Sequence, residues 1–299
     1  MPGTENRPLR AAAMMLLAVA FFSLMDAGLK QLSTHYPALQ VAALRGASSL
    51  PFVLAWALAT AGARPLLRVR WSLHLLRGVI GIAMMASFVY ALRTLPLSTA
   101  YSIFFVAPLL VTALSVPVLG ERVGPRRWAA IGTGLLGVLV LLRPTGEGLL
   151  SLAALAVLLS AAMYAVSAIT VRVLARTDST QAMMVWLMAM MAGGAALLAL
   201  PDWTPVRGEH AWLIVGIGVG GALGQYAVTE AFRVGEASMV APLEYTALVW
   251  GVLLDLAIWG VLPDAITWLG AAIIVGSGLY LLRRERARGA TAPDIVTTP

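Results

Sequence analysis

The chain contains no cysteine and only three histidines among its 299 residues. The absence of cysteine excludes disulfide bonds, thiolate metal sites and cysteine nucleophiles. The histidines, His35, His74 and His210, fall in loops or at the ends of apolar segments and predict no metal cluster. The H-E-x-x-H, G-x-S-x-G and P-loop signatures are also missing. We therefore expect no metal and no other cofactor, and predict that the protein is not an enzyme.

Charged residues are also scarce, at 12% of the chain, whereas 60% of the residues are hydrophobic. Soluble proteins are about 25% charged and about 45–50% apolar. A mean hydropathy of +0.86 leaves too little polar surface to face water on all sides. This composition excludes a soluble enzyme and a disordered chain, and it predicts an all-α integral membrane protein whose surroundings are the lipid bilayer.

Ten apolar segments are separated by polar breaks, and each is close to the roughly 20 residues that a membrane-spanning helix needs. We predict ten transmembrane helices over residues 10–32, 38–60, 72–92, 96–119, 126–142, 149–171, 180–200, 211–233, 238–260 and 265–282.

The distribution of lysine and arginine predicts the orientation of the chain. With the N-terminus in the cytoplasm, cytoplasmic segments hold 15 of these residues and outside loops hold 4. Both termini are therefore expected in the cytoplasm. The net charge of +7 has the same explanation, because no lysine and arginine run reaches the size of a domain. We expect no nucleic-acid partner.

The chain contains an internal repeat. Residues 73–143 align without gaps on residues 213–283, with 15 identities in 71 positions. Chance at this composition gives roughly 6 or 7. Each copy has five spans, an odd number, so the second copy is inverted in the membrane. We predict a cytoplasmic N-terminus over 1–9, five-helix repeats over 10–144 and 145–285 around a central cavity, and a disordered cytoplasmic tail over 286–299. Inverted repeats are typical of transporters.

Residues 105–144 carry a family resemblance. A proline in the fourth span is followed by a Gly-Glu pair and then a glycine-rich fifth span, at Pro108, Gly120-Glu121, and Gly132, Gly134 and Gly137. This pattern resembles the end of an EamA domain of the drug/metabolite transporter superfamily. The second copy keeps Gly260 but has Val261 in place of the glutamate.

The resemblance covers about residues 10–285 and implies ten spans in two inverted halves that export small metabolites. Within the superfamily the chain is similar to bacterial YddG-type exporters of aromatic and other neutral amino acids. That similarity implies the bacterial cytoplasmic (inner) membrane, a small-molecule substrate, and either a monomer or a homodimer.

Seven charged residues fall inside the predicted spans, where each costs about 2.5–3.5 kcal/mol at mid-bilayer. Most must therefore pair with each other or face water. The seven are Asp26, Lys30, Arg45, Arg77, Glu230, Glu244 and Asp255.

Each embedded charge has a functional and a structural interpretation. Glu244 would bind a substrate ammonium or carry a proton, or it would pair with Arg45 or Arg77. Asp26 is a second candidate for coupling, although Lys30 lies one turn away and favours a local pair. Arg45 would hold a substrate carboxylate or neutralise an embedded acid. At 100° per residue, Glu244 and Asp255 point the same way on one helix.

Polar and aromatic residues recur at helical spacing on the fourth and sixth spans. These stripes are typical of a water-filled path, although interhelical hydrogen bonds produce the same pattern. Together with aromatic residues of other spans they predict a wall for apolar cargo. The predicted cavity residues are Glu244, Tyr245, Trp250, Tyr101, Phe105, Tyr164, Gln225, Arg45 and Phe88.

Prolines and glycines mark candidate hinges. Pro108 and Pro242 each remove one backbone hydrogen bond inside a span. A ridge of Gly216, Gly220 and Gly224 predicts close helix packing, either static or as a surface on which one bundle rocks against another.

These features favour a secondary transporter that exports neutral or aromatic amino acids, or similar small metabolites, by alternating access. A carrier of phosphorylated or nucleotide-linked solutes is the second hypothesis, although few cations are available for it. A membrane-embedded enzyme is the third.

Overall fold

The computed structural model describes residues 6–120, 124–125, 128–129, 132–133, 136–137, 140, 151–235 and 240–289. These residues are helical throughout, joined by short turns, and include no strand. The elements are α1 (Asn6–Ser33), α2 (Ala38–Ala61), α3 (Arg64–Leu67), α4 (Trp71–Leu92), α5 (Leu97–Phe104), α6 (Val106–Leu119), α8 (Leu152–Leu174), α9 (Thr180–Ala199), η1 (Leu200–Asp202), η2 (Gly208–His210), α10 (Ala211–Val234), η3 (Ala241–Thr246), α12 (Ala247–Leu254), η4 (Asp255–Trp259) and α13 (Ala265–Gly289).

Seven helical segments of the described residues are long and apolar enough to cross a membrane. They correspond to the predicted spans 1 to 4 and 6 to 8. Large side chains such as Val79, Leu197 and Trp212 are exposed on their outer faces, where they suit lipid contact. The seven are Pro8–Ser33, Ala38–Ala61, Trp71–Leu92, Leu97–Leu119, Leu152–Leu174, Thr180–Asp202 and Gly208–Val234.

The other three predicted spans are described less completely, so the count of ten stays a prediction. Much of segment 126–142 lies outside the described residues, as do Glu121 and Gly134 of the predicted family motif. Segment 238–260 is helical from residue 240 onward, in the shorter pieces η3, α12 and η4. The last segment is the apolar part of α13, which continues to Gly289.

Local sequence explains where helices begin and end. The Ser151 and Ser179 hydroxyls each accept a hydrogen bond from a backbone N–H three residues on, at 3.1 and 3.2 Å, as N-caps of α8 and α9. Gly120 and Gly260 end α6 and η4 in the left-handed conformation, with φ of 71° and 66°. Glycine adopts this conformation without steric strain. The two glycines are equivalent positions in the sequence repeat.

The fourth span is interrupted in the middle. α5 ends at Phe104, α6 begins at Val106, and Phe105 lies between them. Pro108 has no N–H to donate to the carbonyl of Phe104, so the helical ladder lacks a bond at this point. The interruption lies at mid-span, next to the cavity described below.

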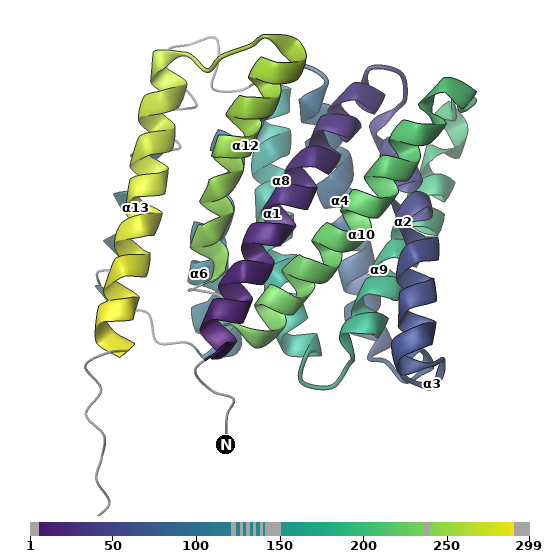
Figure 1. Cartoon of the computed structure of the whole chain (residues 1–299), viewed down its shortest axis with the longest axis horizontal. Coiled ribbons are helices and arrows are strands. Elements are labelled where there is room, and N and C mark those ends of the chain that lie inside the picture. The colour runs from purple at the N-terminus through teal and green to yellow at the C-terminus, as the bar shows by residue number, and fades with distance from the viewer. Residues whose placement is uncertain are drawn as a thin grey trace, which may run out of the picture.

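The helices run along one common direction and the two halves of the chain interleave (Figure 1). α1 packs along α10, α2 along α9, and α4 along α8. Each of these pairs joins an element before residue 144 to one after residue 151. α1 begins and α13 ends at the same end of the bundle (Figure 1). The buried space between the halves contains the candidate site.

Candidate functional site

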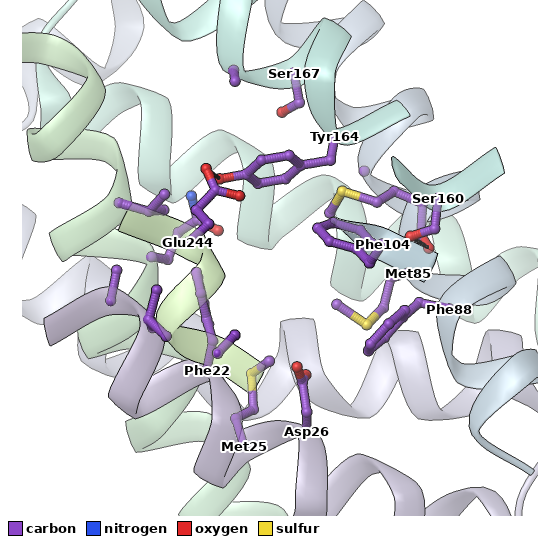
Figure 2. A pocket seen from close by; sticks show the side chains of 18 of the residues that line it. Phe22, Met25, Asp26, Met85, Phe88, Phe104, Ser160, Tyr164, Ser167 and Glu244 are labelled. Carbon is purple, nitrogen blue, oxygen red and sulfur yellow. Dashed lines mark hydrogen bonds between the residues drawn. The ribbon is translucent and has the colours of Figure 1, made fainter. Parts of the chain in front are cut away.

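A cavity of about 1160 Å³, counting space that is open to solvent, lies between the helices of the bundle. Residues from α1, α2, α4, α5, α8, α9, α10, η3 and α12 line it, so both halves contribute. Its walls are largely apolar, and Figure 2 shows two carboxylates on opposite sides of the space. Clefts of this kind, apolar with a few polar groups, are typical of small-molecule sites.

The first carboxylate is Asp26 on α1, which is 8% exposed. The Tyr101 hydroxyl on α5 donates a hydrogen bond of 2.9 Å to Asp26 Oδ2. Sequence analysis favoured a local pair between Asp26 and Lys30, and this interpretation was wrong. Lys30 instead donates to the Leu95 carbonyl at 3.1 Å and lies 3.7 Å from Asp255. Asp26 is thereby left facing the cavity.

The second carboxylate is Glu244 on η3, also 8% exposed. The Tyr164 hydroxyl on α8 donates a hydrogen bond of 2.9 Å to Glu244 Oε1 (Figure 2). The alternative in which Glu244 pairs with Arg45 or Arg77 is not formed among the described residues. Among the residues that the structure describes, a tyrosine thus holds each cavity acid, and no cation bonds directly to either one.

The two cavity arginines have other partners. Arg45 is 3% exposed, and its Nε and Nη1 lie 3.1 Å from the sulfurs of Met25 and Met191. Arg77 is 2% exposed and donates to the Met183 carbonyl at 2.8 Å. Arg45 attracts Asp26 through space without a direct hydrogen bond. Formally, the two guanidinium charges cancel the two carboxylate charges in one low-dielectric space.

Aromatic rings form the wall between the two carboxylates (Figure 2). Phe88 stacks parallel to Tyr101, with ring centroids 6.3 Å apart and an interplanar angle of 9°. Phe104 contacts Phe88 at 5.8 Å and Tyr164 at 5.4 Å. The tyrosines that hold the acids are thus fixed by the same rings that line the cavity. A flat apolar ring bound here would find stacking and edge contacts.

Seven of the nine predicted cavity residues line the cavity, namely Glu244, Tyr101, Phe105, Tyr164, Gln225, Arg45 and Phe88. Gln225 donates to the Thr229 hydroxyl at 3.1 Å. Tyr245 does not line the cavity but is buried edge-to-face against Phe105, with centroids 5.2 Å apart. Trp250 does not line the cavity either, but is half-buried against an apolar cluster that includes the lining residues Met15 and Phe232.

The candidate hinges lie in different environments. Pro108 falls in the first turn of α6, beside the interruption at Phe105, and Pro242 falls in the first turn of η3. Of the glycine ridge, Gly224 packs tightly, since an added Cβ would lie 2.6 Å from the Phe22 ring. Added Cβ atoms would have ordinary contacts at Gly220 and open space at Gly216.

Two of the remaining embedded acids hold the structure together. Asp255, fully buried, accepts hydrogen bonds from the backbone N–H groups of Leu97 and Ser98 at 3.0 and 2.7 Å, and so caps α5. Glu230 pairs with Arg10 at 2.9 Å and with Arg233 at 3.3 Å. Glu244 and Asp255 therefore do not share one environment. The uniform 100° step fails between them because the chain around Glu244, up to Thr246, is a 3₁₀-helix.

Sequence analysis missed several lining residues, chiefly apolar ones. An apolar residue that lines a cavity has the same composition and spacing as one that faces lipid, so no sequence signal separates the two. Methionines are typical of such walls because they adapt to irregular shapes. The missed residues include Phe22, Met25, Met84, Met85 and Phe232.

Polar contacts hold the two ends of the bundle. At the end where α1 begins, His74 Nε2 lies 2.9 Å from Asp178 Oδ2, and the Arg70 amide donates to the same oxygen at 3.0 Å. Burial raises the pKa of Asp178, but hydrogen bonds from Thr177, Arg70 and His74 outweigh it, and the pKa lies below its ordinary value of 3.8.

At the opposite end the Tyr36 hydroxyl lies 2.7 Å from His210 Nδ1 and accepts a hydrogen bond from the Arg207 amide at 3.0 Å. Each end contact joins a segment of the first half to a segment of the second half. The three histidines of the chain all lie at these ends, because the ring of His35 contacts that of His210 with centroids 4.6 Å apart. Among the described residues there is no cluster able to hold a metal ion.

Comparison with known proteins identifies relatives along nearly the whole chain. The riboflavin transporter of Vibrio cholerae is 32% identical over 286 residues, which cover 94% of this chain and 95% of the relative. The pseudopaline exporter of Pseudomonas aeruginosa is 28% identical, covering 93% and 98%. The S-adenosylmethionine uptake transporter of Rickettsia prowazekii is 28% identical, covering 91% and 92%. None of these three relatives is named as an amino-acid exporter, the type that the sequence resembles.

A solved crystal structure has the same fold, with a TM-score of 0.71 and 23% identity over 94% of this chain and 99% of that one. The model of the EamA-like transporter family matches residues 9–143 and 151–283. Because this match extends over both halves, and a relative above 30% identity spans nearly the whole length, the chain belongs to the EamA-like transporter family.

Proposed function

We propose that the protein is a secondary transporter that moves a small, net-neutral metabolite with an aromatic or apolar body across the bacterial cytoplasmic membrane. The observation that carries this proposal is the cavity of about 1160 Å³, lined by both halves of the chain and containing two buried acids and two buried arginines. Intramembrane ionisable groups that face a cavity are typical of substrate pathways.

Ten spans in two inverted five-helix repeats are part of the proposal, and equivalent positions support them. Phe105 aligns with Tyr245 in the repeat, and these two rings contact each other. Such a contact is expected near a pseudo-two-fold axis. Gly78 on α4 packs against Met190 of α9, and its equivalent Gly218 on α10 packs against Ser48 of α2. Equivalent glycines thus contact equivalent helices of opposite halves.

Alternating access is the proposed mechanism, and the end contacts support it. One contact joins Tyr36 to His210 at one end of the bundle, and the other joins His74 to Asp178 at the opposite end. Each contact therefore ties the first half of the chain to the second half. Breaking one while keeping the other would open the cavity to one side at a time. The arginine distribution favours the cytoplasm for the end that carries His74 and both termini.

The charge balance of the cavity favours solutes without net charge. Two carboxylates and two guanidinium groups leave no cationic surplus for a phosphorylated or nucleotide-linked solute. Riboflavin is the first candidate, because a riboflavin transporter is a relative and the aromatic wall suits a flat ring. Neutral or aromatic amino acids are the second candidate, because Arg45 and the two acids offer opposite charges for a zwitterion. We infer export as the direction for such solutes.

The test is a flux assay with purified protein in proteoliposomes. Uptake and release of labelled riboflavin, tryptophan and S-adenosylmethionine are compared with empty liposomes, with and without a proton gradient. We expect flux of at least one uncharged or zwitterionic solute above the empty control. Equal flux with and without protein would refute the proposal.

Two neighbouring tryptophan variants on α8 serve as a matched pair. Ser160 lines the cavity, whereas Leu159 is 49% exposed on the outer face. We expect S160W to fill the cavity and abolish flux, and L159W to retain it. Equal loss in both variants would show that flux does not pass through this cavity.

A further inference from the structure

Each of the two cavity acids accepts a hydrogen bond from a tyrosine, but the spans that carry the acid and the tyrosine are exchanged between the two halves. In the first half the acid is on α1 and its tyrosine is on α5, the fourth predicted span. In the second half the tyrosine is on α8 and the acid is on η3, in the ninth predicted span. Each half therefore places one tyrosine–carboxylate pair between its first and fourth spans.

Each acid retains acceptor capacity for a ligand. A carboxylate has about four lone-pair positions, and the tyrosine uses one of them. Asp26 and Glu244 are both 8% exposed, and no guanidinium bonds to them in the part of the chain that the structure describes. Buried carboxylates are stabilised by donors, so N–H or O–H groups of a solute are the matching chemistry.

The space between the acids suits a flat body. Asp26 and Glu244 face the cavity from opposite sides, with Phe88, Phe104 and Met85 along the wall between them (Figure 2). A ring system seated against this wall would present its two ends to the two carboxylates. Because the tyrosines that hold the acids are themselves packed on these rings, the acceptors are fixed before the solute arrives.

Resting on the proposed function, we propose that the cavity binds a flat, net-neutral ring system with two separate N–H or O–H donor groups, one for each carboxylate. Asp26 and Glu244 are the specificity-determining acceptors, and Tyr101 and Tyr164 are positioning residues. Riboflavin has this pattern, with an imide N–H on its terminal pyrimidine ring and hydroxyls on the ribityl chain, which is attached to the central ring.

The test uses three flavins and purified full-length protein. In 3-methylriboflavin the imide donor is blocked, and in lumiflavin the ribityl hydroxyls are absent. Flavin fluorescence gives Kd for each compound with the wild type, D26N and E244Q. Loss of one charge-assisted hydrogen bond weakens binding about tenfold. E230Q is the matched control, because Glu230 is buried in ion pairs and does not line the cavity.

We expect a crossed pattern. One acid variant should weaken the binding of riboflavin and lumiflavin about tenfold and leave the binding of 3-methylriboflavin unchanged. The other should weaken the binding of riboflavin and 3-methylriboflavin and leave that of lumiflavin unchanged. Y101F and Y164F should reproduce the pattern of the acid that each one holds, with a smaller loss. Melting temperatures without ligand establish that each variant is folded.

Three outcomes would overturn the inference. The first is wild-type protein that does not bind riboflavin, the second is a pair of acid variants with unchanged Kd, and the third is both variants affecting the same analogue. In each case flux of another solute in proteoliposomes would leave the transport proposal standing. Absence of flux for all solutes would refute the transport proposal itself.

Discussion

Gly218 on α10 offers a sharp test of how the two halves pack. A Cβ added at this position would lie 2.5 Å from the carbonyl oxygen of Ser48 and 2.7 Å from its carbonyl carbon, both backbone atoms of α2. Gly216, half a turn earlier on the same helix, has no atom within 4 Å of an added Cβ. The variants G218A and G216A therefore add the same methyl group in opposite environments.

The magnitudes follow from two separate effects. Alanine is favoured over glycine inside a helix by about 1 kcal/mol, and both variants gain this amount. Only G218A forces backbone atoms apart, because a backbone carbonyl cannot rotate away as a side chain can, and overpacking of this kind costs about 1–3 kcal/mol. The difference between the two variants isolates the overpacking. We expect G216A to be about 1 kcal/mol more stable than the wild type, and G218A to be about 1–3 kcal/mol less stable than G216A.

Equilibrium unfolding in mixed micelles measures both variants under one set of conditions. G78A adds a graded comparison, because its Cβ would meet the movable sulfur of Met190 at 2.4 Å as well as its Cβ at 2.9 Å. We expect its cost to lie between those of the other two variants. Equal stability of G216A and G218A would contradict the close approach of α10 to α2, and with it the packing of the two halves.

Three further predictions concern groups outside the cavity. D255N replaces one of the two oxygens that accept from backbone N–H groups with an NH2 donor and leaves Lys30 without its ion-pair partner, so we expect a loss of about 3–5 kcal/mol in the same unfolding assay, with substrate selectivity unchanged. Because the pKa of Asp178 is lowered in the folded protein, its contribution is complete above pH 3.8 and is lost as pH falls through the folded pKa. D178N should therefore lower the melting temperature at pH 6 and flatten its fall between pH 4 and pH 2, whereas parallel curves for the two proteins would exclude a role for this carboxylate. Tyr245 has a buried hydroxyl with no hydrogen-bond partner among the described residues. Y245F should raise stability by about 1 kcal/mol and leave flux unchanged, whereas a loss of stability would indicate a partner for the hydroxyl.

Much of the polar part of the cavity was predictable because charges are costly inside apolar spans. Arg45 and Glu244 are conspicuous in the sequence for this reason, and both line the cavity. Tyr101 and Tyr164 were predictable from the helical spacing of polar residues on their spans. In each case a polar side chain in an apolar segment is expected to face a cavity or to contact a polar partner.

The partners of these charges were not predictable from spacing. Lys30 lies one turn from Asp26 in the sequence, yet it reaches Asp255 instead, 225 positions further along the chain. It also lies 4.5 Å from the Trp259 ring centroid. Local spacing indicates which contacts are possible, but tertiary packing determines which of them form. Here it leaves the Asp26 carboxylate free to accept a hydrogen bond from Tyr101.

The direction in which side chains of the ninth span point was also not predictable from the sequence. A uniform α-helical step places Glu244 and Asp255 on one face, whereas the chain passes through a 3₁₀-helix, an α-helix and a π-helical turn between residues 241 and 259. A 3₁₀-helix has 3.0 residues per turn, so each of its residues changes the phase relative to an α-helix. Proline at position 242 marked the region as irregular without specifying the kind of irregularity.

The exchanged tyrosine–carboxylate pairs explain why the repeat alignment did not reveal the site. Asp26 lies outside the aligned segments and Glu244 is opposite Phe104, so neither acid has an aligned counterpart of its own kind. Tyr101 is one helical turn from Phe104, the equivalent of Glu244. The two halves thus keep the same interaction between the same two spans while its donor and acceptor have changed places. Identity between repeats is retained at tightly packed glycines, since an added Cβ would meet the backbone of α2 at Gly218 and the Met190 side chain at Gly78. It is lost in the cavity, where either order of donor and acceptor forms the same hydrogen bond.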